Sequence, residues 1–199
     1  MNIGHSVRYF DAQFQQQVAA GENSLNPFET AALPFLHGSL LDFGCGLGNL
    51  ALSAARRGCS VLALDASPAA IQHLRQAAAL EALPLRAEEA DLVNYELNED
   101  FDAIVCIGLL MFFDCNTAYR QLAQLQAHVR PGGLLVLNVL TDGTTYMDMF
   151  AADQHCLFKA DEVRARFAGW ELLAFEQQEF AAADATRKCF VTVTARRAL

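Results

Sequence analysis

Three glycines at every second position form the part of the sequence best suited to hold a ligand. Gly44, Gly46 and Gly48 follow a short apolar run, Leu40–Phe43, and precede a segment with helical character. Glycine has no Cβ and tolerates positive φ, so a ligand can rest against bare main chain there. The free amides at the start of a helix point outward and favour an anionic group. The pattern therefore predicts a ligand-binding turn between a strand and a helix.

Two carboxylates near this turn narrow the choice of ligand. Asp65 ends the next apolar run, about 20 residues after the first glycine, where a carboxylate can accept hydrogen bonds from two ribose hydroxyls. A dinucleotide motif would place its last glycine at position 49, which is Asn49 here. Asp42 would repel a pyrophosphate and attract an ammonium group. These residues favour S-adenosylmethionine, which carries an ammonium, a carboxylate, a ribose and an adenine, over a nicotinamide dinucleotide.

Each of these residues also has a purely structural interpretation. The glycines could form a plain tight turn, Asp65 could cap the helix that begins at Ser67-Pro68, and Asp42 could hold the loop through backbone amides. We interpret Cys45 as a small residue tolerated between glycines and not as a nucleophile.

The elements that must position these residues alternate along the chain. Helices are expected at residues 7–20, after the Asn26 cap and Pro27, and at 49–57, 68–82, 117–129 and 160–167. Apolar runs predict strands at residues 40–43, 60–64, 85–90, 101–108, 134–140, 170–180 and 189–195. This order favours a Rossmann-like α/β fold: a mostly parallel seven-stranded sheet with helices on both faces and an antiparallel C-terminal hairpin. The ligand then lies beyond the carboxyl ends of the strands, where the strand order reverses.

Four segments in this order resemble class I S-adenosylmethionine-dependent methyltransferases. They are LLDFGCGLGNLALSAARRGCSVLALDAS, EEADLVNY, FDAIVCIGLLMFF and RPGGLLVL, within residues 40–140. The resemblance places Asp91 at the adenine amino group and Leu92 beside the ring, although Asp91 can also cap a turn. It implies S-adenosylmethionine as cofactor, S-adenosylhomocysteine as product, and a shared set of cofactor-binding residues: Asp42, Gly44, Cys45, Gly46, Gly48, Asp65, Ala66, Asp91, Leu92 and Ile107.

The C-terminal third resembles the tellurite-resistance (TehB-like) methyltransferases. The run HCLFKADEVRARFAGWELLAFEQQEF and the segment LLMFFD carry this resemblance. Members of that family often place a His-Arg pair after the acidic residue that corresponds to Glu179. This chain has Phe180-Ala181-Ala182-Ala183 instead, and only Arg187 and Lys188 remain nearby. The resemblance implies methyl transfer to a small molecule, such as a chalcogen oxyanion (tellurite or selenite) or a thiol.

We expect one domain over residues 1–199, with a helical lid at 1–38, a cofactor-binding core at 39–140, and a substrate-side loop, helix and closing hairpin at 141–199. Tyr9 from the lid, Phe112 and Phe113 after the fourth strand, and Tyr146 after the fifth should wall the substrate pocket. Phe112 and Phe113 fit a place in the core equally well. We assign no catalytic residue, because an ionised nucleophile needs positioning more than a base.

Charge and cysteine content limit the kinds of binding partner and metal site that the chain can have. The net charge of -9 disfavours nucleic acid and acidic membrane surfaces. Six scattered cysteines without a C-x-x-C pair predict reduced thiols, not a disulfide framework, and no Cys/His spacing fits a metal site. The sequence shows neither a signal peptide nor a membrane span, so we expect a cytoplasmic protein, as a monomer or weak homodimer.

Two other functions remain open at this point. The chain could be a non-catalytic S-adenosylmethionine-binding regulatory protein, because no catalytic base is visible in the sequence. It could also be an NAD-dependent oxidoreductase, which Asn49 and Asp42 disfavour.

Overall fold

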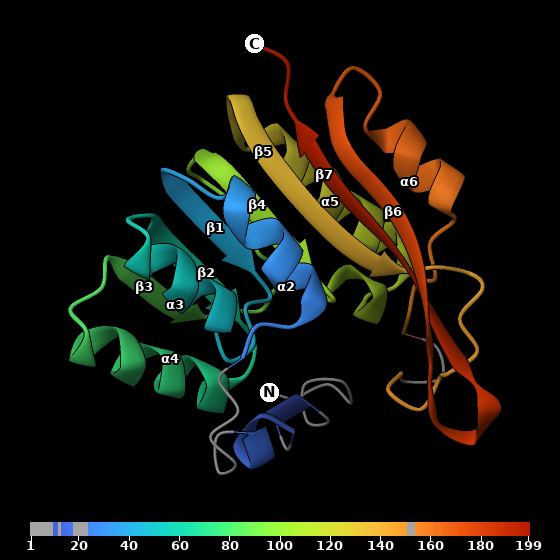
Figure 1. The fold of residues 1–199 in the computed structure, drawn as a ribbon, viewed down its shortest axis with the longest axis horizontal. Coiled ribbons are helices and arrows are strands. Elements are labelled where there is room, and N and C mark those ends of the chain that lie inside the picture. Colours follow the sequence, from blue (N-terminus) through green and yellow to red (C-terminus); the bar gives the residue numbers. More distant parts are fainter. Residues whose placement is uncertain (1–9, 12, 18–23, 151–153) are drawn as a thin grey trace.

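A seven-stranded sheet organises the chain in the computed structural model, which describes residues 10–11, 13–17, 24–150 and 154–199. The strand order is β3-β2-β1-β4-β5-β7-β6 (Figure 1). Strands β1 to β5 pair in parallel, and β7 pairs antiparallel with both β5 and β6. This confirms the expected mostly parallel sheet with an antiparallel hairpin. The strands are β1 (Ser39–Phe43), β2 (Ser60–Asp65), β3 (Leu85–Glu89), β4 (Phe101–Ile107), β5 (Val129–Leu140), β6 (Glu171–Ala181) and β7 (Arg187–Arg196).

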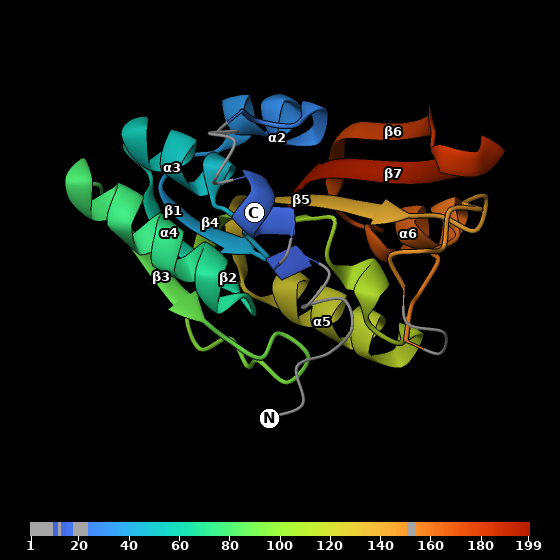
Figure 2. The same ribbon diagram turned by 90° about the horizontal axis from the view of Figure 1, so that it is seen from below.

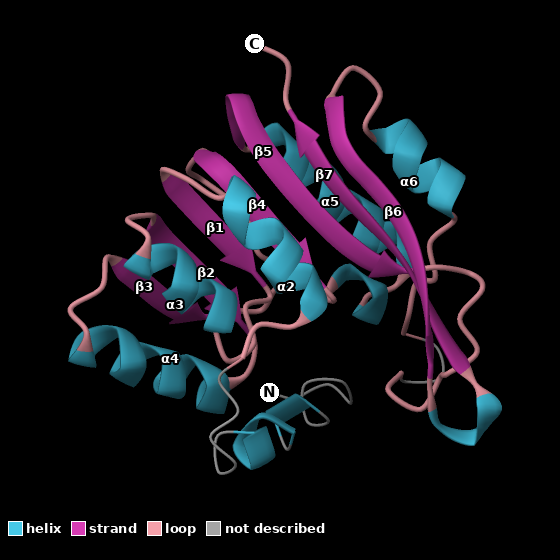
Figure 3. Cartoon of the chain, viewed as in Figure 1, coloured by secondary structure: helices cyan, strands magenta, loops and turns pink. Residues whose placement is uncertain are grey.

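Helices cover both faces of the sheet (Figures 2 and 3). Side chains alternate along a strand, so Leu40 of β1 packs with α3 and α4, whereas Leu41 joins the layer that contains α5 and α6. No helix in the described part is long and apolar enough to cross a membrane. The helices are α2 (Pro27–Ala32), α3 (Asn49–Arg56), α4 (Pro68–Leu80), α5 (Cys115–Ala127) and α6 (Ala160–Arg166), with short 3₁₀ turns η1 (Leu33–Phe35), η2 (Leu110–Phe112) and η3 (Ala183–Ala185).

The strand order reverses beside β1, which lies between β2 and β4. The chain leaves β1 for α3 and the β2–β3 side, and later returns to place β4 on the opposite edge of β1. The loop that joins β1 to α3 therefore sits at the switch point, where open α/β sheets bind their ligands. This is the loop that contains the three glycines.

Local capping explains where the helices begin. The Asn26 side chain accepts a hydrogen bond from the Glu29 amide, and the Glu29 carboxylate accepts one from the Asn26 amide, so α2 starts with the expected cap and Pro27. Helix α5 begins at Cys115, two residues before the predicted start. The reason is that the Asp114 side chain caps it by accepting from the Thr117 amide.

Strand β5 differs most from its prediction. Arg130–Gly133 lies between the helix predicted to end at residue 129 and the strand predicted to begin at residue 134, but it belongs to the strand, which begins at Val129. Its backbone groups pair with the end of the chain: the Gly132 amide donates to the Arg197 carbonyl, and the Arg197 amide donates to the Gly133 carbonyl. The register shifts between Phe101 and Ala103 of the neighbouring β4, which accommodates the extra residues as a bulge.

Part of the expected N-terminal helix falls within the described residues. Residues 10–11 and 13–17 are helical, while the rest of the predicted segment lies outside the described part of the chain. Phe10 of this helix stacks edge-on against Phe112 of η2, with ring centroids 5.0 Å apart. The N-terminal segment therefore reaches across the sheet edge to the turn that follows β4.

The prediction that all six cysteines are reduced thiols is wrong for two of them. Cys115 at the start of α5 forms a disulfide with Cys156, 41 residues later. The loop after β5 returns to η2, where the Cys156 amide donates to the Met111 carbonyl at 2.9 Å. Folding thus brings together two cysteines whose spacing in the sequence gives no signal. Cys45, Cys59, Cys106 and Cys189 are free.

Candidate functional site

The glycine loop has a shape that other residues could not easily adopt. Gly44 and Gly48 have φ of +85° and +74°, a region that residues with a Cβ rarely enter. A Cβ on Gly44 would lie 2.8 Å from the Leu109 side chain, and one on Gly48 would lie 2.5 Å from Leu74. These two glycines are therefore required by close packing of the protein itself. Gly46 also has a positive φ, of +52°, and a Cβ there would lie 3.1 Å from the Phe14 ring.

Asp65 at the end of β2 is held against this loop. One carboxylate oxygen accepts a hydrogen bond from the Gly46 amide at 2.8 Å, and the other accepts one from the Ser67 amide at 2.9 Å. Burial raises the pKa of the Asp65 carboxyl, while hydrogen bonds from these amides oppose the rise. The Ser67 hydroxyl caps α4 and also donates to Asp11 at 2.6 Å. The carboxylate is thus fixed in orientation before any ligand arrives.

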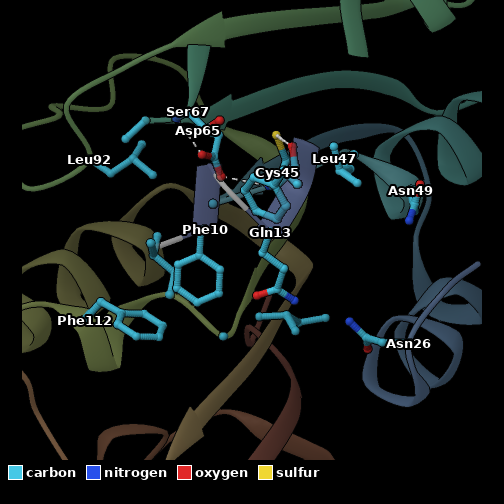
Figure 4. Close-up of a pocket in the computed structure, with 18 of the residues that line it drawn as sticks. Phe10, Gln13, Asn26, Cys45, Leu47, Asn49, Asp65, Ser67, Leu92 and Phe112 are labelled. Carbon is cyan, nitrogen blue, oxygen red and sulfur yellow. Dashed lines mark hydrogen bonds between the residues drawn. The ribbon is translucent and has the colours of Figure 1, made fainter. Parts of the chain in front are cut away.

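A cavity of about 640 Å³ opens around Asp65 and the glycine loop (Figure 4). This volume is within the range of small-molecule and cofactor sites. Seven segments build its wall: the N-terminal helix, the start of α2, the loops after β1, β2 and β4, the turn after β3, and the stretch before Cys156. The lining residues used below are Phe10, Gln13, Phe14, Gln17, Asn26, Glu29, Gly44, Cys45, Gly46, Gly48, Asn49, Asp65, Ala66, Asp91, Leu92, Ile107, Phe112, Phe113 and Gln154.

The structure brings most of the predicted site residues together around this cavity. Of the predicted cofactor-binding set, all but Asp42 line it. Phe112 and Phe113 of the predicted substrate pocket also line it. Tyr146 instead lines a second hollow, beside α2 and the β6–β7 hairpin. Tyr9 lies outside the described residues.

Asp42 lies beneath the glycine loop. It is 5% exposed and is not among the residues that line the cavity. Burial, with the negative charges of Glu29 and Asp65, raises the pKa of its carboxyl to about 8. The carboxyl is therefore mostly protonated at neutral pH in this state. Its predicted contact with an ammonium group remains a prediction.

Asp91 caps its own turn at the wall of the cavity, and its predicted contact with adenine stays a prediction. Its carboxylate accepts hydrogen bonds from the Val93 amide at 3.2 Å and from the Asn94 side chain at 2.9 Å, so it stabilises its own turn. The same turn lines the cavity, beside the mostly buried Leu92. The structure thus places an acidic and an apolar group next to each other at the end of the cavity nearest β3.

Cys45 is a neutral, packed thiol. It is 7% exposed and its sulfur donates to the Gly46 carbonyl at 3.6 Å. Burial, with the negative charges of Asp42 and Asp65, raises the pKa of the thiol well above its usual value. Since the thiolate is the nucleophilic form, this environment supports the interpretation of Cys45 as a small residue in a tight loop.

Sequence reasoning missed the amide side chains of the cavity. Gln13 and Gln17 lie on one face of the N-terminal helix, Asn26 precedes α2, and Gln154 comes from the loop after β5. Gln13 and Gln17 are four residues apart, which is the only sequence signal that they share a helical face. Nothing in the sequence joins them to Asn26 or Gln154.

An aromatic row closes the cavity on the side of η2. Phe112 contacts Phe10 and Phe150, with centroids 5.0 and 5.1 Å apart, and Phe150 contacts His155 at 5.1 Å. The charged residues among the described lining are all acidic: Glu29, Asp65 and Asp91. No group of three metal-binding side chains gathers anywhere in the described residues. The cavity therefore offers apolar walls, neutral amides and carboxylates.

Comparison with known proteins agrees with this geometry. Residues 40–133 match the family model of a methyltransferase domain. This match begins in β1 and contains the glycine loop, Asp65 and the Asp91 turn. Residues 40–133 thus match a methyltransferase domain.

Similar proteins extend the comparison beyond the domain. Hemagglutinin 1 of Eikenella corrodens is 39% identical over 143 residues, which cover 69% of this chain and 45% of the relative. Carboxy-S-adenosyl-L-methionine synthase of Vibrio parahaemolyticus is 31% identical over 137 residues, or 65% of this chain and 56% of the relative. The chain thus spans about half the length of these curated relatives.

A solved structure shows the same fold. The chain superposes on TehB from Haemophilus influenzae with a TM-score of 0.78 at 18% identity, over 91% of this chain and 65% of that chain. The predicted Rossmann-like fold and the predicted likeness to TehB are confirmed at the level of the fold.

Proposed function

We propose that this methyltransferase domain is an active enzyme that transfers a methyl group from S-adenosylmethionine to a small-molecule acceptor. The observation that carries the proposal is the fixed Asp65 carboxylate facing the glycine loop in a cavity of about 640 Å³. A regulatory protein that only binds the cofactor would share this feature, and product formation separates the two.

The residues around the cavity suit this cofactor. Each Asp65 oxygen uses one lone pair on a backbone amide and can accept a further hydrogen bond from a ribose hydroxyl. In the proposed binding mode, Leu92 and Ile107 supply apolar surface for the adenine ring, and Asp91 accepts a hydrogen bond from its amino group; all three residues line the cavity. When bound, S-adenosylmethionine supplies an electrophilic methyl group on a sulfonium sulfur.

The protein favours methyl transfer by positioning the two reactants and by excluding water from them. Phe10 and Phe112 cover the side of the cavity next to η2, so that a cofactor bound in the cavity is shielded from solvent on that side. Holding two reactants about 3–3.5 Å apart in the right orientation can lower a barrier by about 7–11 kcal/mol. Closure of the site also strengthens electrostatic interactions inside it. We extend the proposal to the N-terminal segment, residues 1–38, as a helical lid, because Phe10, Gln13 and Gln17 line the cavity.

For the methyl acceptor, the proposal names chemical classes and no individual compound. Chalcogen oxyanions and thiols follow from the resemblance to TehB-like enzymes, but the described lining carries no cationic side chain that would bind an oxyanion. A panel of oxyanions, thiols, amines and phenols identifies the class through release of S-adenosylhomocysteine and the mass of the methylated product.

The proposed location is the cytoplasm, and the proposed assembly is a monomer or weak homodimer. The disulfide argues against that location, because disulfides are rare in that compartment.

The cofactor assignment is tested by calorimetric titration with S-adenosylhomocysteine. We expect wild type to bind it and Asp65→Ala to bind at least tenfold more weakly, because two hydrogen bonds to a charged acceptor are lost. Asp161→Ala, an exposed carboxylate on α6, is the matched control and should bind as wild type. Equal affinity in Asp65→Ala and wild type contradicts the ribose assignment, and no binding to wild type at millimolar concentration contradicts the cofactor.

A further inference from the structure

A second hollow of about 460 Å³ lies between the start of α2 and the tip of the β6–β7 hairpin. The hairpin tip projects beyond the carboxyl end of β5, toward the same edge of the sheet as the cofactor cavity (Figure 1). Asn26 lines the cofactor cavity, and the next two residues, Pro27 and Phe28, line this hollow. Consecutive residues at the start of α2 therefore line the two sites.

Three phenylalanines form the apolar wall of the hollow. Phe28 of α2 contacts Phe190 of β7 at 4.9 Å and Phe180 of β6 at 5.8 Å between ring centroids. Phe180 and Phe190 contact each other at 5.9 Å. Phe180 is nevertheless 40% exposed, which is unusual for a side chain of this size in an aromatic cluster. The adjoining residues at the hairpin tip, Ala181 to Ala183, are small and leave the hollow open.

One cation faces these rings. Lys188 pairs with Phe180 across the hairpin and lies two residues before Phe190, so all three side chains share one face of the sheet. Its ammonium lies 4.6 Å from the centroid of the Tyr146 ring. Tyr146 is held in place by its amide, which donates to the Arg187 carbonyl at 3.1 Å.

Lys188 has no carboxylate partner within the described part of the chain. None of the ion pairs there involves it, whereas the neighbouring Arg187 is bonded to the Gly143 carbonyl and lies near Glu179. Burial lowers the pKa of the Lys188 ammonium, and no acidic group counters this effect. The Tyr146 ring offsets part of the cost of burying this cation, and an anionic ligand would supply the charge partner that the described residues do not.

We propose that this hollow binds the methyl acceptor, and that the acceptor is a small aromatic acid. Its anionic group pairs with Lys188, and its ring packs on Phe28, Phe180 and Phe190. This proposal rests on the proposed function, because it supplies the acceptor for that transfer. In the reaction the acceptor's oxygen, nitrogen or sulfur bonds to the methyl carbon, and the carbon–sulfur bond of S-adenosylmethionine breaks with its electrons left on sulfur. The proton of the acceptor atom leaves to solvent.

Binding is tested first with simple probes on the full chain. Benzoate has the ring and the charge, benzamide has the ring without the charge, and acetate has the charge without the ring. We expect benzoate to bind wild type, measured by titration in nuclear magnetic resonance, at least tenfold more tightly than either of the others. Equal binding of benzoate and benzamide overturns the role of the charge.

Variants then locate the site. Lys188→Met should weaken benzoate binding at least tenfold, Lys188→Arg should stay within about threefold of wild type because it keeps the charge, and Phe180→Ala should weaken binding by removing a ring. Lys159→Met is the matched control, since Lys159 is an exposed lysine paired with Glu162 on α6. Unchanged benzoate affinity in Lys188→Met overturns the proposal.

Titration of the same variants with S-adenosylhomocysteine separates this proposal from the cofactor assignment and confirms that each variant is folded. If that ligand binds and benzoate does not, the hollow is not the acceptor site while the proposed function stands. If benzoate binds through Lys188 and S-adenosylhomocysteine does not bind, the cofactor assignment fails, and with it the acceptor role of the hollow.

Turnover completes the test. The probes are 4-hydroxybenzoate, 4-aminobenzoate and 4-mercaptobenzoate, each beside its benzamide, with product mass as the readout. We expect methylation of at least one acid, with none or much less of its amide, and a rise in KM in Lys188→Met that exceeds the fall in kcat. Methylation of the amides as fast as the acids contradicts the proposal.

Discussion

The disulfide between Cys115 and Cys156 should contribute a large part of the stability of this chain. It closes a loop with a sequence separation of 41 residues. A cross-link of that length removes about 13 cal/mol/K of entropy from the unfolded chain, which corresponds to about 4 kcal/mol at 25 °C. For a protein of this size, about 4 kcal/mol lowers Tm by about 8–16 °C. The loss is large because native domains are stable by only about 5–15 kcal/mol.

The perturbation is Cys115→Ser, measured by urea unfolding under oxidising conditions. Cys115 is exposed, so the serine hydroxyl stays solvated, whereas Cys156 is 1% exposed and its replacement would add a burial penalty. Reduction of wild type should reproduce the variant's midpoint, and reduction of the variant should change nothing further. Cys189→Ser, at a free cysteine that is partly exposed, is the control and should respond to reductant as wild type does.

Two results would refute this reasoning. One is a wild-type midpoint that does not move on reduction. The other is alkylation of both Cys115 and Cys156 in unreduced protein, detected by peptide mass, which would show that the bond is absent in solution.

Three further predictions concern the core and its ionisable groups. Gly48→Ala should lower the free energy of unfolding by about 2–4 kcal/mol and abolish binding of S-adenosylhomocysteine. The reason is that it adds a strained left-handed residue and a clash with a buried leucine of α4. Unchanged stability in urea contradicts this. The pKa of Asp42 is raised to about 8, so the folded state holds a proton that the unfolded state releases near pH 4. The stability of wild type relative to Asp42→Asn should therefore fall as pH rises from about 4 to about 8, and it should level off above that range. A stability difference that is independent of pH between pH 4 and 9 would rule this out. Asp102 behaves in the opposite way, because hydrogen bonds from Ser39 and Arg130 lower the pKa of its carboxyl to about 2. The advantage of wild type over Asp102→Asn should be full above about pH 4 and disappear as pH falls through about 2, and an advantage that persists in acid would argue against the ion pair.

Local signals predicted the cofactor side of the site. The glycine spacing and the position of Asp65 each follow from one strand and the turn after it, so a short window of sequence contains the information. The capping of α2 by Asn26 is equally local. Alternation of strands and helices then fixed the order of the elements well enough to place both residues at one edge of the sheet.

The features that sequence did not predict depend on distant parts of the chain. Gln154 reaches the cavity only because the loop after β5 folds back to η2, and the same return pairs Cys156 with Cys115. Tyr146 was expected beside Phe112, but its amide is bound to the Arg187 carbonyl, so it faces the hairpin. Pairings of this kind are set by tertiary packing, for which a single sequence has no periodic signal.

The position of β7 has a consequence for how the chain is made. β6 lies at the edge of the sheet, and its only strand neighbour in the described structure is β7, which follows it along the sequence and inserts between it and β5. During synthesis on the ribosome, β6 therefore emerges with no docked neighbour, and β5 keeps one edge exposed. The amino-terminal half of the sheet can assemble as it emerges, whereas the side formed by β5 and β6 must wait for β7. The time between the synthesis of β6 and that of β7 is therefore when a nascent chain most needs protection from aggregation.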